Sequence, residues 1–122
     1  MTVRVLIADD DPLIRDVLRD VLDDEPDLEV VAVASDAREA VELAELHLPS
    51  VVVLDVRMPH GGGARAATEI LQRAPGTRIV AFSAYTDVGA VDEMRRAGVT
   101  EYLAKGVRNT ELVDVVRRLG EQ

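Results

Sequence analysis

The sequence predicts an α/β domain in which five parallel strands form one sheet that helices cover on both faces. Five short, β-branched apolar runs alternate with five longer stretches of helical periodicity, which is the pattern of repeated βα units. The runs are apolar at nearly every position, as strands buried on both faces of a parallel sheet are. The chain has 122 residues, 48% of them hydrophobic, which suits a single domain with one sizeable core.

Each predicted strand is an apolar run of strand length. The third run ends in Asp55 and is the most β-branched, which favours a central place in the sheet. The five strands are predicted at residues 3–8, 28–34, 50–55, 78–82 and 99–103.

The first two predicted helices have recognisable ends. Asp11 is expected to cap the first helix, and Pro12 suits its first turn because proline needs no partner for an N–H there. Ser35 or Asp36 starts the second helix, and Pro49 stops it.

The other three helices follow the same logic. The third is predicted at about residues 64–74, after a glycine-rich turn. The fourth is predicted at residues 87–97, where Gly98 provides the left-handed residue that often ends a helix. Asn109 or Thr110 is expected to cap the last helix.

Five βα units of this length fit the flavodoxin-like strand order 2-1-3-4-5, with right-handed crossovers. The strand order reverses between strands one and three. In open parallel sheets, ligands bind beyond the carboxyl ends of the strands at such a reversal. The expected site therefore lies at this edge of the sheet.

The composition limits the classes of partner. The sequence has 14 Lys and Arg residues against 23 Asp and Glu, a net charge of -9. Such an acidic chain does not hold nucleic acid or an anionic membrane by nonspecific charge, but it suits cations or a partner with a basic face. Cysteine is absent, which excludes disulfides and thiolate zinc sites.

The sequence also bears on location and domain organisation. No apolar run approaches the roughly 20 residues that span a bilayer. Acidic residues come too early for a signal peptide, so we expect a cytoplasmic protein. Residues 1–122 are predicted to form one domain, either alone or as the N-terminal part of a longer protein.

Polar side chains follow four of the predicted strands. Asp9 and Asp10 come after the first strand, Asp55 ends the third, Ser83 follows the fourth, and Lys105 follows the fifth. Because the carboxyl ends of parallel strands meet at one edge, we expect these side chains to lie close together. Neighbouring carboxylates repel each other, and a hard divalent cation such as Mg²⁺ or Mn²⁺ relieves that repulsion.

This group of residues suits phosphoryl transfer. An ionised Asp55 is a competent nucleophile toward a phosphoryl donor and would form an aspartyl-phosphate. The cation and the ammonium of Lys105 would neutralise phosphate oxygens, and the Ser83 hydroxyl would donate a hydrogen bond to one of them.

Four segments resemble the receiver domain of bacterial two-component response regulators, in order and spacing, over nearly the whole chain. They are LIADDDPLIR, VVVLDVRMP, AFSAY and EYLAKG. The first two are nearest in wording to receivers that precede LuxR-type helix-turn-helix domains, although these 122 residues contain no such DNA-binding domain. The resemblance implies a phosphorelay function, in which a sensor histidine kinase passes a phosphoryl group to the receiver and slow hydrolysis follows.

The resemblance assigns the acceptor and the metal ligands. Asp55 matches the phospho-accepting aspartate, and Asp9 and Asp10 match the acidic pair that organises Mg²⁺. Arg57 matches the position that supplies a backbone carbonyl to the metal.

The resemblance also assigns a switch. Ser83 matches the switch hydroxyl, and Lys105 matches the phosphate-contacting lysine. Tyr102 matches the aromatic that turns inward when the hydroxyl engages the phosphoryl group; the alternative is a half-exposed edge tyrosine. The implied readout surface is the fourth helix, fifth strand and fifth helix, which would contact an output domain, an effector or, on phosphorylation, a second copy.

The chain departs from the family pattern in two loops. The family lysine is often followed by a cis proline, but Gly106 follows Lys105 here. Because a non-proline cis bond costs roughly 3–4 kcal/mol, the geometry of this loop is open. Gly106 and Gly62 favour looser loops, and His60 stands where many members have a small residue.

Several polar residues have simpler interpretations. Asp11 is interpreted as a helix cap, Tyr85 as a surface loop residue, and His47 and His60 as surface residues without metal-ligand spacing. The run of glycines at residues 61–63 lacks the lysine of a phosphate-binding loop, which favours a permissive turn.

Two other functions are weighed against the leading one. A receiver-like docking scaffold would never be phosphorylated. A phosphohydrolase with an aspartyl nucleophile would need a second acid where Arg57 stands, and no cap domain is present. The sequence favours a signalling module that is not an enzyme and catalyses only its own phosphorylation and dephosphorylation.

Overall fold

A computed structural model describes residues 2–84 and 88–122, in which strands and helices alternate as the sequence predicts. The strands are β1 (Val3–Ala8), β2 (Leu28–Ala34), β3 (Val51–Asp55), β4 (Arg78–Ser83) and β5 (Glu101–Ala104). The helices are α1 (Pro12–Asp23), α2 (Ala37–His47), α3 (Gly62–Arg73), α4 (Val88–Arg96) and α5 (Asn109–Gly120).

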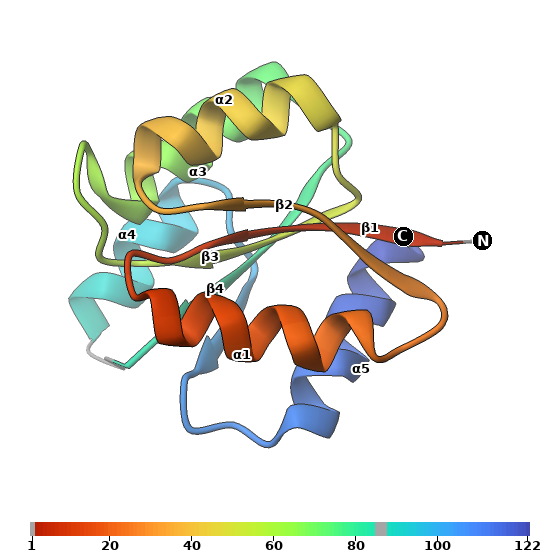
Figure 1. Ribbon diagram of the computed structural model, residues 1–122. Coiled ribbons are helices and arrows are strands. Elements are labelled where there is room, and N and C mark those ends of the chain that lie inside the picture. Colours follow the sequence, from red (N-terminus) through yellow and green to blue (C-terminus); the bar gives the residue numbers. More distant parts are fainter. Residues whose placement is uncertain (1, 85–87) are drawn as a thin grey trace.

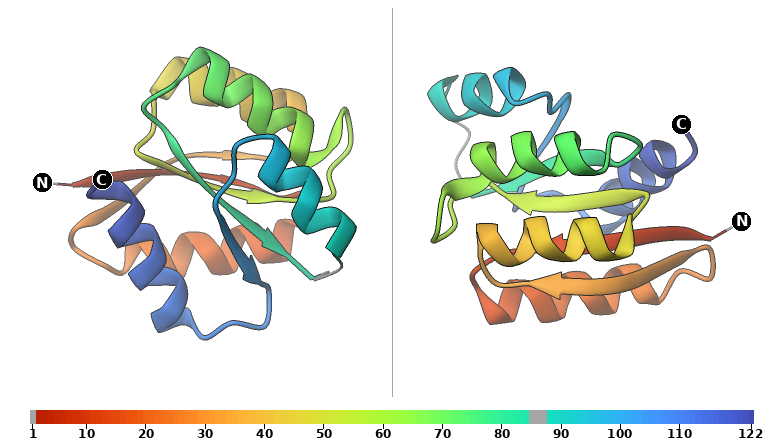
Figure 2. Two further views of the ribbon diagram at one scale, coloured as in Figure 1. Left: turned by 180° about the vertical axis from the view of Figure 1, so that it is seen from behind. Right: turned by 90° about the horizontal axis from the view of Figure 1, so that it is seen from above.

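The strands form one parallel sheet in the order β2-β1-β3-β4-β5, which confirms the predicted flavodoxin-like order. Helices α1 and α5 cover one face of the sheet, and α2, α3 and α4 cover the other (Figure 1). The two chain ends lie close together at the end of the sheet opposite the carboxyl ends of the strands (Figure 2).

Alternate residues of the central strands fill two apolar cores. Leu6 and Leu54 pack under α2 and α3, whereas Ile7 and Val53 pack under α1 and α5. This explains why the central strands are apolar at every position. Within the described residues, no helix combines the length and the apolar character needed to cross a bilayer.

The predicted caps of the first two helices are confirmed. The Asp11 carboxylate accepts a hydrogen bond from the Leu13 N–H at 2.9 Å at the start of α1. The Asp36 carboxylate accepts one from the Glu39 N–H at 2.8 Å at the start of α2. Both satisfy N–H groups that the first helical turn leaves without a partner.

The later boundaries differ from the predicted ones. Strand β5 begins at Glu101 and not at residue 99, because the Val99 N–H closes the end of α4 by donating to the Met94 carbonyl at 3.0 Å. Gly98, with φ of 101°, makes this reversal possible and ends the helix as predicted. The predicted start of α4 at Asp87 lies outside the described residues.

Two helix starts were also predicted wrongly. Helix α3 begins at Gly62 instead of residue 64, directly after Gly61, whose φ of 119° turns the chain into the helix. Helix α5 begins at Asn109 with Arg108 at the cap position and no side-chain cap hydrogen bond, so neither Asn109 nor Thr110 caps it.

Arg4 of β1 closes the far end of α2. Its guanidinium donates to the main-chain carbonyls of His47 at 2.7 Å and Leu48 at 3.3 Å, which the last helical turn leaves without partners. We expect Arg4→Met to lower the free energy of unfolding by about 1–2 kcal/mol, because these carbonyls lose a charged donor. Urea denaturation measures the change. The exposed Arg78 provides the control, and an equal loss in Arg78→Met would contradict the explanation.

Candidate functional site

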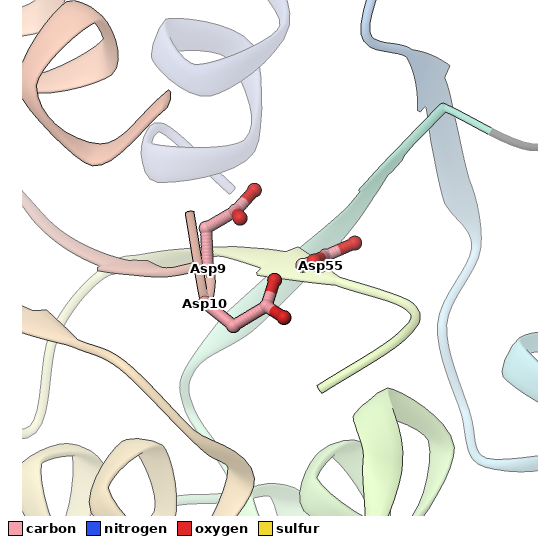
Figure 3. Close-up of side chains that lie close together, drawn as sticks. All are labelled: Asp9, Asp10 and Asp55. Carbon is pink, nitrogen blue, oxygen red and sulfur yellow. The ribbon is translucent and has the colours of Figure 1, made fainter. Parts of the chain in front are cut away.

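The predicted site residues come together at the carboxyl ends of the strands. Asp9 and Asp10 directly follow β1, and Asp55 is the last residue of β3, which pairs with β1. Their carboxyl groups gather into an acidic cluster at the point where the strand order reverses (Figure 3). Each of the three offers one oxygen, and these oxygens all lie within 4.8 Å of one another.

The three carboxylates differ in burial and in their partners. Asp9 is 1% exposed and Asp55 4%, whereas Asp10 is exposed. Oδ1 of Asp9 accepts a hydrogen bond from the Asp11 N–H at 2.9 Å. Oδ2 of Asp9 is buried, and the ammonium of Lys105, 2.8 Å away, is the one polar partner it contacts among the described residues. The site thus holds a buried oxygen with unused acceptor capacity.

Lys105 bridges two of the acids from the end of β5. Its Nζ lies 2.8 Å from Asp9 Oδ2 and 3.5 Å from Asp55 Oδ2. Burial alone would lower the pKa of Lys105, but close contact with the two carboxylates outweighs it and raises the pKa. Lys105 therefore stays protonated and supplies one fixed positive charge to the acidic cluster.

Asp55 is the acid whose charge is most costly. Burial, together with the nearby Asp9 charge, raises the pKa of Asp55 from 3.8 to about 6, although Lys105 acts to lower it. One ammonium does not balance three carboxylates. The site is therefore left with excess negative charge that a further cation would relieve.

A hard divalent cation fits this donor set. Mg²⁺ and Mn²⁺ prefer oxygen ligands, and Asp9, Asp10 and Asp55 supply carboxylate oxygens within reach of one ion. Arg57 stands two residues after Asp55 in the chain, and its main-chain N–H donates to Asp55 Oδ1 at 3.4 Å.

The two predicted switch residues lie on the adjoining strands. Ser83 ends β4 one position beyond Phe82, the residue that pairs with Asp55, and it is 1% exposed. Its carbonyl accepts the Lys105 N–H at 2.9 Å, which ties the ends of β4 and β5 together. Tyr102, on β5, is half-buried and packs against the apolar core on the side of α4.

The loop after Asp55 is held by its own main chain. The Gly63 N–H donates to the Val56 carbonyl at 2.9 Å, and the Pro59 carbonyl accepts the Ala37 N–H at 3.1 Å. His60 is exposed, as predicted, and lies 4.0 Å from Asp36. These contacts fix the loop against α2 and α3.

The other simpler interpretations are also tested by the structure. Of the glycine run, Gly61 lies in the turn before α3, whereas Gly62 and Gly63 belong to the helix; φ is positive at Gly61 and Gly62. His47 is half-buried and ends α2, so it is not fully on the surface. Tyr85 lies outside the described residues. Every described peptide bond is trans, and this includes Lys105–Gly106.

Two site contacts are absent from the sequence predictions. The Arg15 guanidinium donates to the main-chain carbonyl of Asp9 at 2.8 Å. A side chain at Gly63 would meet the main-chain oxygen of Asp55. Arg15 stands inside the segment LIADDDPLIR, so its place in that segment is the one signal the sequence offers for it.

Comparison with known proteins shows which family the chain resembles. Residues 5–117 match the response regulator receiver domain family. The chain is 36% identical over 115 residues to the uncharacterized transcriptional regulatory protein YxjL of Bacillus subtilis, covering 94% of this chain and 53% of that protein. It is 43% identical over 115 residues to the transcriptional regulatory protein PdtaR of Mycobacterium tuberculosis, covering 93% and 54%. The chain spans about half the length of these curated relatives.

Solved structures show the same fold. The signal receiver domain of the putative response regulator NarL from Mycobacterium tuberculosis matches with a TM-score of 0.94 and 33% identity, covering 98% of this chain and 97% of that one. The response regulator domain of Thermotoga maritima CheB matches with a TM-score of 0.90 and 32% identity, covering 100% and 98%. With five βα units, an acidic cluster at the strand ends and a family match over most of its length, the chain belongs to the receiver domains of two-component response regulators.

Proposed function

We propose that Asp55 is the phosphoacceptor of this receiver domain and takes its phosphoryl group from a phosphohistidine of a sensor histidine kinase. The observation that carries the proposal is the position of Asp55 in the acidic cluster, beside two further acids and 3.5 Å from the Lys105 ammonium. An oxygen of the Asp55 carboxylate forms the new bond to phosphorus as the phosphorus–nitrogen bond of the donor breaks.

The chain's own residues prepare this step. Asp9 and Asp10, with the main-chain carbonyl of Arg57, would hold Mg²⁺, or Mn²⁺, against Asp55. The bound ion would neutralise charge on the phosphoryl oxygens. Lys105 supplies a second positive charge 3.5 Å from Asp55, and in a loose transition state such neutralisation and positioning account for most of the catalysis.

We assign the switch to Ser83 and Tyr102. Ser83 ends the strand beside Asp55, where its hydroxyl would donate to a phosphoryl oxygen. Phosphorylation adds about −1.5 to −2 charges, and drawing β4 toward them would shift Tyr102 and the surface of α4, β5 and α5 between two conformations. An output domain, an effector or a second copy would read that surface. The cytoplasmic location predicted from the sequence stays a prediction.

Helix α1 supports docking of the kinase next to the site. Leu13 and Val17 are 68% and 47% exposed on this helix, which directly follows Asp9 and Asp10. An apolar stripe exposed beside an acceptor site suits a helix of the donor protein. Docking here would bring a donor histidine to the edge of the sheet where Asp55 lies.

Neither alternative function fits the site as well. A docking scaffold has no need for an ammonium between two buried acids. A phosphohydrolase would need a second acid where Arg57 stands. We therefore expect no turnover of an external phosphate ester, and only phosphorylation and slow dephosphorylation of the domain itself.

Incubation with Mg²⁺ and acetyl phosphate or phosphoramidate tests the acceptor. We expect a mass gain of one phosphoryl group that disappears in Asp55→Ala, because the nucleophile is then missing. The gain should remain in Asp16→Asn, which removes an exposed carboxylate of α1. Absence of labelling in the native protein, or full labelling of Asp55→Ala, would show that Asp55 is not the acceptor.

A further inference from the structure

Arg15 holds the main chain on which the two N-terminal acids of the site are mounted. It lies in the first turns of α1, and its Nη1 donates to the carbonyl oxygen of Asp9 at 2.8 Å in partly buried surroundings. A charged donor in such surroundings makes a stronger hydrogen bond than an exposed one. The contact is therefore well placed to fix the direction of that carbonyl.

The orientation of the Asp9 carbonyl bears directly on Asp10. A peptide unit is planar, so fixing the carbonyl of Asp9 also fixes the N–H and the Cα of Asp10. The other side of Asp9 is already held, because its N–H donates to the Ala34 carbonyl at 3.1 Å. The Asp10 side chain is exposed and accepts no hydrogen bond from the described residues. Its placement thus depends on the main chain that Arg15 holds.

We propose that Arg15 is a positioning residue that presents Asp10, together with Asp9, to the divalent cation. This inference rests on the proposed function, because it assumes that the acidic cluster binds Mg²⁺. Arg15 contacts none of the reacting atoms and acts through the Asp9–Asp10 peptide. The competing explanation is a purely structural role, in which the guanidinium only attaches α1 to the end of β1.

Another arginine of the same helix provides a matched control. Arg19 lies one turn further along α1, its side chain is 58% exposed, and its Nε lies 3.8 Å from Asp23. Arg19→Met removes the same charge from the same helix, keeps a similar aliphatic stem and does not touch the acidic pair. Comparing Arg15→Met with Arg19→Met therefore separates the carbonyl contact from a general loss of charge on α1.

The decisive measurement is the dissociation constant for Mg²⁺ alone, obtained by calorimetric titration without any phosphoryl donor. We expect Arg15→Met to raise this constant about 10-fold, the usual effect of losing a group that orients a metal ligand. Arg15→Lys should bind Mg²⁺ more tightly than Arg15→Met, because lysine keeps a charged donor. It should bind more weakly than the native protein, because the ammonium lacks the planar geometry of the guanidinium. Arg19→Met should bind Mg²⁺ like the native protein. At saturating Mg²⁺, labelling by acetyl phosphate should return close to the native rate in Arg15→Met.

A double-mutant cycle tests whether the effect passes through Asp10. If it does, Asp10→Asn weakens Mg²⁺ binding, and adding Arg15→Met to Asp10→Asn weakens it little further, because the two changes disrupt one unit. Full additivity of the two losses would overturn the proposal. So would an unchanged dissociation constant in Arg15→Met accompanied by a lower melting temperature in chelator, which is the result of a purely structural role.

The remaining outcomes are also decisive. If Arg15→Met does not fold, the comparison of Arg15→Lys with the native protein carries the test, and equal Mg²⁺ affinities would overturn the proposal. If the native protein itself gives no binding signal, the proposed function fails first and this inference with it. That result differs plainly from a native protein that binds Mg²⁺ and an Arg15 variant that binds it equally well.

Discussion

Replacing Gly63 with alanine is expected to lower the free energy of unfolding by about 2–3 kcal/mol and to reduce phosphorylation of Asp55 strongly. A Cβ at this position would collide with the main-chain oxygen of Asp55, and it would lie 2.8 Å from the Cα of Val56 and 2.9 Å from the Val56 oxygen. All three are main-chain atoms, so no side chain can rotate away to make room. The loop after β3 would have to move, and Asp55 with it.

Urea denaturation and mass-spectrometric labelling by acetyl phosphate measure the two effects, with labelling carried out where the variant is still folded. Gly76→Ala is the control, because a Cβ there meets nothing within 4 Å. We expect Gly76→Ala to keep native stability and labelling within error. If Gly63→Ala unfolded at the native urea concentration and was labelled normally, the close approach of α3 to β3 would not position the acceptor.

The sequence predicted the sheet and the acids well, because both depend on local patterns. A short, β-branched run that is apolar at every position favours a buried strand, and the residue where such a run stops lies at an edge of the sheet. Asp9, Asp10 and Asp55 each stand at such a stop. Once five βα units are counted, the edge at which these acids meet follows from topology, and the structure places them within 4.8 Å as expected.

What the sequence could not supply are contacts made by the main chain across long separations. The requirement for glycine at Gly63 comes from the distance between α3 and the end of β3, which no periodicity encodes. The Arg15 contact depends on where α1 turns back over Asp9. The start of β5 was misplaced because Val99 is apolar, yet its N–H belongs to the end of α4.

The composition also contains a signal for the site that the sequence predictions did not use. Of the 14 basic residues, Lys105 is the only lysine. A compact ammonium suits a narrow position between two acids, whereas a planar guanidinium suits bidentate pairing with a single carboxylate. The structure agrees, since Lys105 contacts Asp9 and Asp55, while most arginines with described ion pairs lie at the surface.

Asp55→Asn is expected to stabilise the domain at neutral pH in the absence of divalent cations, by about 1–3 kcal/mol in the free energy of unfolding. The folded protein raises the pKa of Asp55 from 3.8 to about 6, chiefly because the carboxylate is buried and next because Asp9 lies near it. Well below pH 4 the carboxyl is protonated in both states and adds no penalty. As the pH rises from about 4 to about 6, the unfolded chain has released this proton while the folded one still holds it, so stability is lost. Asparagine keeps the shape without the charge and avoids that loss.

Chemical denaturation of Asp55→Asn and native protein in chelator, at several pH values between 4 and 8, measures the difference. We expect the stability of the variant over the native protein to grow between pH 4 and about 6 and then to level off, because Asp55 is by then ionised in both states. Asp16→Asn, at an exposed carboxylate, should show no such rise. Mg²⁺ should then raise the melting temperature of the native protein more than that of Asp55→Asn, because only the native site offers the third carboxylate. Suppose instead that the difference in the free energy of unfolding between variant and native protein stayed constant across this range. The folded site would then not disfavour the Asp55 charge, and no cation would be needed to compensate for it.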